Sequence, residues 1–190
     1  MGTAWKNDHA GGRTVGAGIR ANDGRRRGEH GAARHRQGAG SRLASPATTP
    51  PAGALPLARV TPATTEMGTF DSWQTESVSV EGVGYDEAIV ATVLAGSTGS
   101  TRFAEFVLGR KYKRLTGKVT LADDSKVTTP VPFVIALDDR AQERKNVTTR
   151  PLELNVDLND VNRIRFELTE ADGGCTKASK VAFVGLTAQP

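Results

Sequence analysis

Hydrophobic and polar residues alternate along much of the second half of the chain. Every second residue is apolar in the segment 131–137, and the same period recurs in 152–158 and 164–168. Successive side chains of a β-strand point to opposite faces, so this period predicts strands with one buried face and one solvated face. The side chains expected to face inward are Val131, Phe133, Ile135, Leu137, Leu152, Leu154, Val156, Leu158, Ile164, Phe166 and Leu168.

Turn-forming sequences separate the predicted strands. LADDS, LDDR, LNDVN and ADGG are rich in Asp, Asn and Gly, which favour turns because they bind nearby backbone or accept positive φ. The last strand, KVAFVGLTA, is apolar on both faces, as expected for a strand inside a sandwich. Residues 68–190 show no apolar stripe of the kind that marks a helix of three turns. Roughly seven to nine short strands over this length predict an all-β fold, an antiparallel β-sandwich.

The first 66 residues differ in composition from the rest. Residues 1–43 hold ten of the 21 glycines and all three histidines, without apolar periodicity, so we expect a disordered basic Gly/Arg-rich tail. Residues 44–66 are rich in Pro, Thr and Ala, which predicts an extended linker. The predicted β-sandwich module therefore spans residues 67–190.

Positive charge is concentrated in the tail. Residues 1–50 carry eight Arg and one Lys against three acidic residues, whereas the remainder of the chain is net acidic within an overall charge of +4. An excess of basic over acidic residues favours nucleic acid or anionic membranes as partners, but here that argument applies to the tail alone. The tail is open to three interpretations: an arm for RNA or acidic lipid, a solvated tail, or the product of an over-extended reading frame ahead of Met67. For the patterned region we expect no nucleic-acid partner.

The sequence lacks the side-chain combinations of common enzymes. No histidine follows His35 and Cys175 is the single cysteine, which excludes a Ser-His-Asp or Cys-His pairing in the patterned region, a zinc site and an intrachain disulfide. The glycine-rich segment 95–103 leads into another strand, so it predicts a hairpin loop and not a phosphate loop. The longest apolar run, 88–95, is too short to span a membrane, and residues 1–40 show no signal-peptide core. We therefore expect a non-catalytic protein.

Acidic pairs are the candidates for metal binding. Asp123 and Asp124 stand together in a predicted turn, and carboxylate oxygens are ligands that calcium prefers. A structural calcium ion held by this pair is the cofactor hypothesis, and a turn-forming role is the alternative. Further oxygen-bearing candidates are Asp138, Asp139, Asn155, Asp157, Asn159 and Asp160.

The aromatic residues fall into two groups. Trp73, Tyr85 and Tyr112 lie near the ends of predicted strands, where an amphipathic ring can stack against the C–H face of a sugar. We predict these three as carbohydrate-binding residues, with packing at the edge of the sandwich as the alternative for each. Five phenylalanines at inward positions of the predicted strands are expected in the core: Phe103, Phe106, Phe133, Phe166 and Phe183.

The order of these motifs over residues 70–188 is similar to the NPCBM family of carbohydrate-binding modules, which is found beside glycosyl hydrolase family 98 enzymes. The resemblance rests on ESVSVEGVGYDEAI, on RFAEFVLGRKYKRLTGKVTLADDS, and on FVIALDDR followed by PLELNVDLNDVNRIRFELTE. The positions that match the family pattern are Tyr85, Leu108, Gly109, Tyr112, Leu115, Gly117, Asp123, Asp124, Phe133, Ile135, Asp138, Leu154, Val156, Asp157, Val161, Ile164, Phe166 and Leu168.

The resemblance implies a galactose-binding-like jelly roll and a carbohydrate-binding function in the extracellular space or cell envelope. It implies carbohydrate as ligand and a neighbouring glycoside hydrolase or other bacterial surface protein as partner. The chain departs from the family in its last strand, where a family His or Asp and a Trp are replaced by KASKVAFVGLTA, with Phe183 or Val184 at the Trp position. The alternative function is a protein-interaction or sensory β-sandwich without a sugar ligand.

Overall fold

The described part of the chain forms two antiparallel β-sheets. A computed structural model describes residues 51–66, 72–94, 101–169 and 178–190. The predicted tail 1–43, the first seven residues of the predicted linker (44–50), residues 95–100 of the predicted loop, the ADGG turn and Cys175 lie outside the described residues. The elements are β1 (Leu55–Pro56), the single-turn 3₁₀ helix η1 (Leu57–Arg59), β2 (Thr64–Glu66), β3 (Ser72–Val80), β4 (Val83–Leu94), β5 (Thr101–Val107), β6 (Arg114–Leu121), β7 (Val131–Leu137), β8 (Arg140–Ala141), β9 (Lys145–Val147), β10 (Leu152–Asp157), β11 (Arg163–Thr169) and β12 (Ala178–Gln189).

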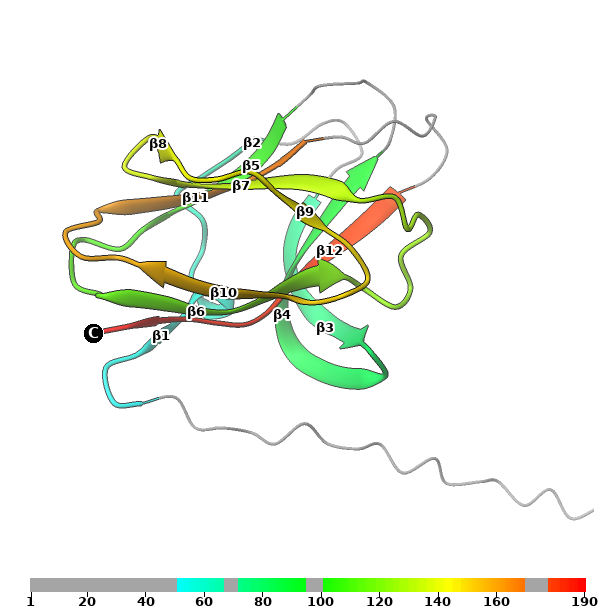
Figure 1. Ribbon diagram of the computed structural model, residues 1–190. Coiled ribbons are helices and arrows are strands. Elements are labelled where there is room, and N and C mark those ends of the chain that lie inside the picture. The colour runs from blue at the N-terminus through cyan, green and yellow to red at the C-terminus, as the bar shows by residue number, and fades with distance from the viewer. Residues whose placement is uncertain (1–50, 67–71, 95–100, 170–177) are drawn as a thin grey trace, which may run out of the picture. The chain divides into compact units, whose positions relative to one another are not determined.

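The two sheets pack face to face as an antiparallel β-sandwich (Figure 1). One sheet has the order β10-β6-β12-β4-β3, with β1 also paired to β12. The other has the order β2-β5-β11-β7-β8, with β9 also paired to β7. The predicted all-β, antiparallel fold is confirmed. No helix among the described residues is long and apolar enough to cross a membrane.

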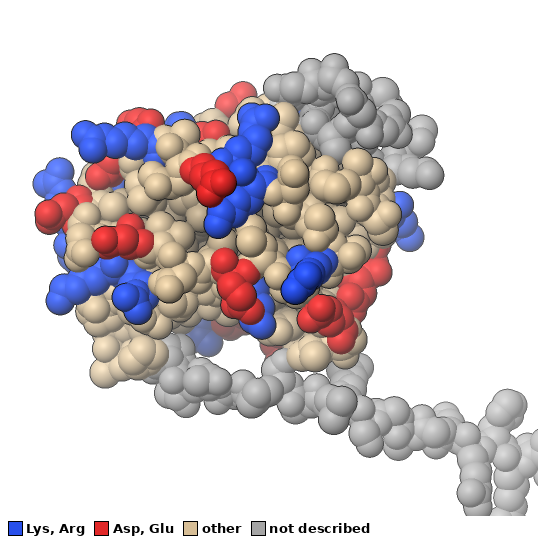
Figure 2. Space-filling model, viewed as in Figure 1, with Lys and Arg blue, Asp and Glu red and all other residues tan. Residues whose placement is uncertain are grey.

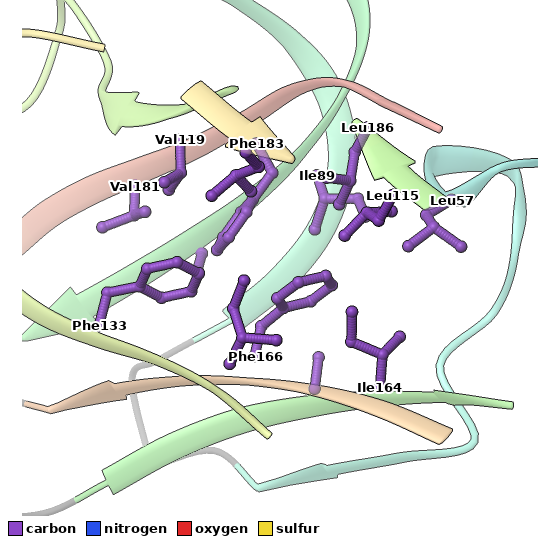
Figure 3. Packing of buried hydrophobic residues seen from close by; sticks show 14 of the residues in the cluster. Leu57, Ile89, Leu115, Val119, Phe133, Ile164, Phe166, Val181, Phe183 and Leu186 are labelled. Carbon is purple, nitrogen blue, oxygen red and sulfur yellow. The ribbon is translucent and has the colours of Figure 1, made fainter. Parts of the chain in front are cut away.

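The main hydrophobic core lies between the sheets, as Figure 3 shows for the residues that it labels. The inward positions predicted from the period of two are buried or half-buried in this core. Phe166 and Phe183 come from opposite sheets, and their ring centroids are 5.3 Å apart. Phe133 packs against both rings, at 6.3 Å from Phe166 and 5.7 Å from Phe183. The burial of these rings joins the two layers.

Strand β12 is buried on both faces, as its sequence predicts. Its odd-numbered residues Val181 and Phe183 enter the main core, whereas Ala182 and Val184 belong to a second cluster on the outer face of the same sheet. Val78 and Val80 near the end of β3 belong to this second cluster too. The β3–β4 hairpin thus contributes apolar side chains to the outer face of β12.

One predicted core residue lies outside the core. Phe103 and Phe106 were both expected to face inward, but they are three residues apart in β5 and therefore point to opposite faces. Phe106 is fully buried between the sheets. Phe103 is half-buried on the outer face, where the Arg165 guanidinium lies 5.1 Å from its ring centroid. The cation–π contact with Arg165 covers part of the Phe103 ring, which the core does not.

Part of the predicted linker belongs to the sandwich. β1 pairs with β12, β2 pairs with β5, and Leu57 between them is fully buried in the main core. Two polar contacts also fix η1: Thr75 Oγ1 donates to the Ala58 carbonyl at 2.8 Å, and Arg59 Nε pairs with Glu87 at 2.7 Å. The structure therefore differs from the sequence prediction over residues 55–66. Two short strand pairings and one buried leucine are enough to hold this Pro-containing segment against the sandwich.

Gly117 in β6 permits close packing against β12. Its φ is +149°, and a Cβ at this position would lie 2.9 Å from the Leu186 Cα. Leu186 lies where the pairing of β12 with β6 shifts register, between Val184 and Thr187. A side chain at Gly117 would push these strands apart, because the obstacle is backbone.

We expect Leu57→Ala to lower the free energy of unfolding by about 2–5 kcal/mol, since it leaves a cavity in the main core. Chemical denaturation of the full chain checks this value. Arg59→Ala is the matched control: its side chain is 68% exposed, so loss of the Glu87 ion pair should leave the free energy of unfolding almost unchanged. Equal, small effects of both substitutions would show that residues 55–66 do not contribute to the sandwich.

Candidate functional site

A groove of about 880 Å³ lies at one open side of the sandwich, between β10 of one sheet and the β7–β9 region of the other. In Figure 1, β10 faces the viewer below β7. The apolar floor of the groove consists of inward side chains from both sheets: Phe133, Ile135, Leu137, Leu154, Val156 and Val161. Ile135, Leu154 and Val161 retain 5–8% exposure, more than most other members of the main core. The groove therefore reaches the edge of the core.

Polar side chains form the rim of the groove. Arg140, Gln142, Glu143 and Lys145 border it along the β8–β9 segment, and Asn155 and Asn159 border it near the end of β10. Over the face that Figure 2 shows, basic and acidic side chains are interspersed, without a large area of one sign. An apolar floor with convergent polar groups is the usual composition of a small-molecule site.

A second, polar hollow of about 520 Å³ adjoins the groove at one end of the sandwich. Its lining includes Lys113 and Arg114 at the start of β6 and Gln189 at the end of β12. Backbone hydrogen bonds hold these segments together: Lys113 N–H donates to the Gln189 carbonyl, and Leu158 N–H donates to the Lys113 carbonyl, each at 2.8 Å. Asn155, Asp157 and Asn159 line both the hollow and the groove.

The three predicted sugar-binding aromatics do not share one surface. Trp73 stacks on Phe183, with ring centroids 5.6 Å apart, and packs against the main core. Tyr85 packs against the second cluster on the outer face of the sheet. Tyr112 packs against the main core in the loop before β6, next in sequence to Lys113 of the hollow. Of the three, only Tyr112 lies in a loop that borders the groove or hollow.

Asp123, a predicted calcium ligand, binds the tip of the β3–β4 hairpin. Its carboxylate accepts hydrogen bonds from Ser79 Oγ at 2.7 Å and from the amides of Glu81 and Gly82 at 2.9 Å. Glu81 and Gly82 have positive φ, which directs successive amides toward one acceptor. The Ser79 hydroxyl, followed by the Gly82 and Glu81 amides, lowers the pKa of this carboxyl.

Asp124, the second predicted ligand, has a different partner. Its carboxylate lies 2.7 Å from Lys180 Nζ, an interaction that raises the pKa of Lys180. Calcium needs six to eight oxygen ligands around one point, whereas the two carboxylates are committed to separate groups. No cluster of three His, Cys, Asp or Glu suited to a metal occurs in the described ranges. Asp123 and Asp124 therefore do not fit a calcium site.

The other acidic candidates take part in turns or line the groove. Asp138 accepts hydrogen bonds from the Asn162 and Arg163 amides, which lower its pKa and tie the β7–β8 turn to the β10–β11 loop. Asp157 accepts from the Asn159 amide at 2.9 Å. The side chains of Asn155 and Asn159 have no hydrogen-bond partner among the described residues. The sequence singled out these residues for metal binding, and the structure places them at the groove.

Several known structures with this fold are carbohydrate-binding modules. A CBM51 module from Clostridium perfringens GH95, in complex with methyl-galactose, aligns with a TM-score of 0.54 at 13% identity, over 72% of this chain and 99% of that one. Tandem CBM51 modules of the family 98 glycoside hydrolase from Streptococcus pneumoniae align with a TM-score of 0.55 at 9% identity, over 73% of this chain and 47% of theirs.

A third similar structure holds CBM51-2, in complex with GlcNAc, and INT domains from Clostridium perfringens ZmpB. It aligns with a TM-score of 0.53 at 13% identity, over 71% of this chain and 31% of that one. No protein-family model matches the chain, and no curated protein matches its sequence. At these identities the comparisons show the fold that the chain shares with carbohydrate-binding modules.

We expect Asp123→Asn to destabilise the fold by about 1 kcal/mol at neutral pH, which is less than is typical of a hydrogen bond to a charged group because the carboxylate is exposed. The folded pKa lies below the ordinary value of 3.8, so this stabilisation is present above that value and disappears as the pH falls through the lowered pKa. Unfolding curves of both proteins from pH 7 to pH 2 should therefore converge at acid pH.

Asp86→Asn is the control, since Asp86 is exposed on β4 and has no partner among the described residues. It should leave stability unchanged throughout. A pH-independent difference between wild type and Asp123→Asn would contradict the role of the Asp123 charge.

Proposed function

We propose that this chain is a non-catalytic module that binds carbohydrate outside the cell or in the cell envelope, alongside a carbohydrate-active or surface protein. The observation that carries the proposal is a sandwich shared with sugar-bound CBM51 modules, together with an apolar-floored groove bordered by amide and charged side chains. The sequence resemblance to the NPCBM family supports the same function, and we propose membership of that family.

The chemistry of the groove suits a sugar. The axial and equatorial C–H groups of a pyranose ring can contact the aliphatic floor, while its hydroxyls require donors and acceptors at the sides. Asn155 and Asn159 offer both a donor and an acceptor, and Arg140 offers donors from the opposite wall. Such groups discriminate between sugars only when the fold positions them before binding. Here β10 and the loop after it hold the two asparagines, and β8 of the other sheet holds Arg140.

The aromatic residues enter the proposal unequally. Tyr112 is the predicted aromatic that we place at the proposed site, since its loop continues into Lys113 and Arg114 of the polar hollow. Trp73 and Tyr85 pack against separate hydrophobic clusters, and their sugar contacts remain predictions. Alanine substitution of each of the three, in protein with a normal unfolding transition, separates them: we expect Tyr112→Ala to weaken glycan binding.

We expect the full-length protein to bind at least one neutral glycan on an array, and titration calorimetry to confirm saturable 1:1 binding. Methyl-galactose and GlcNAc are the first probes, since structures of similar modules contain them. Binding should be the same in calcium and in EDTA, because Asp123 and Asp124 have other partners.

The absence of binding to every glycan tested, by protein with a normal unfolding transition, would contradict the proposed function. It would favour a protein-interaction module of the same fold. Calcium-dependent binding would contradict only the assignment of the acidic pair.

A further inference from the structure

We propose that the groove and the polar hollow form one continuous track for an extended, neutral oligosaccharide, so that the module recognises several consecutive sugar units and not a single terminal sugar. This inference rests on the proposed function, because it assumes that the ligand is carbohydrate.

Continuity of the track follows from shared lining residues. Asn155, Asp157 and Asn159 border the groove on one side and the hollow on the other. These residues lie at the end of β10, whose pairing among the described strands is with β6 alone. The two volumes therefore meet at this strand edge, where a ligand can contact both.

The size of the track exceeds the need of one sugar ring. The groove measures about 880 Å³ and the hollow about 520 Å³. Pockets of roughly 300–1,000 Å³ accommodate drug-sized ligands, which are larger than a monosaccharide. A single ring would leave most of the apolar floor and most of the rim exposed to water, whereas a chain of several rings would cover both.

Unpaired polar groups occur along the whole track. Asn155 and Asn159 at its centre, and Glu143 and Lys145 at the groove end, have side chains without a partner among the described residues. Gln142 makes one long contact, 3.3 Å, from its side-chain amide to the Arg140 carbonyl. The hydrogen-bonding capacity for hydroxyl groups is thus distributed over the track and is not concentrated at one point.

The distribution of charge favours a neutral chain. Four acidic side chains of the groove, Asp138, Glu143, Asp157 and Asp160, outnumber the basic Arg140 and Lys145, and the charge of Glu153 is paired with Lys118 at 2.9 Å. Basic side chains predominate in the hollow, where Lys113 and Arg114 face Asp157. A polyanion would be repelled along the groove and a polycation in the hollow, so neither fits the full length.

Calorimetric titration of the full-length protein with GlcNAc oligomers and with galactan oligomers, each of one to six units, tests the inference. We expect the affinity for one of the two series to rise at least tenfold from the monomer to the tetramer and then to level off. Asn155→Ala, at the junction of the two volumes, should lower tetramer affinity at least fivefold and monomer affinity less. Asn146→Ala is the control, since Asn146 is exposed on β9 and outside both volumes.

The outcomes separate this inference from the proposed function. Equal affinity for monomer and tetramer would overturn the extended track and leave carbohydrate binding intact. The same conclusion would follow if Asn155→Ala did not change the affinity for the tetramer. Tighter binding of heparin or of another acidic polysaccharide would overturn the neutral ligand. If no glycan of either series or of the array binds, the proposed function fails, and the inference fails with it.

Discussion

Phenylalanine packing between the sheets is the contact on which the rest of the molecule depends. Phe183 of one sheet contacts Phe133 and Phe166 of the other, and Phe166 also meets Phe106 at 5.8 Å. The chain has one cysteine, so no intrachain disulfide can replace this burial as the source of stability. Because β7 and β10 belong to different sheets, the same ring contacts set the distance between the two walls of the groove. Fold and site therefore share one determinant.

Several of the longer strands could be predicted from the sequence because a half-buried strand imposes a period of two on its residues. That period identified β7, β10 and β11 with their inward faces, and the continuous apolar run identified β12 as buried on both sides. Periodicity is local, however: the spacing of Phe103 and Phe106 shows that they cannot share a face but not which of them is buried, and the period gives no signal for a docked linker. Phe103 faces Arg165 outside the core, and Leu57 docks from a segment whose prolines indicate a linker.

The candidate site was less accessible to sequence reasoning than the fold. The residues Asn155, Asp157, Asn159 and Asp160 form a recognisable group in the sequence, but their spacing equally suits turns, metal ligands and a binding rim. The binding-rim interpretation is favoured only once the opposite wall of the groove is known, and that wall comes from β7 and the β8–β9 segment in the other sheet. Asp123 shows the same limit: its partners at the hairpin tip lie about forty residues earlier in the chain. A local sequence pattern does not predict a hydrogen bond between residues so far apart in the chain.

Amide chemical-shift mapping of the ¹⁵N-labelled full-length protein, titrated with a neutral tetrasaccharide, tests the central claim most directly. If the groove at β10 is the binding surface, saturable shifts will concentrate in residues 140–145 and 153–160, while the hairpin tip at Glu81 and Gly82 remains unchanged. Saturable shifts confined to residues around Trp73 or Tyr85 would contradict the assignment of the groove. The absence of shifts with every neutral tetrasaccharide tested would contradict carbohydrate binding itself.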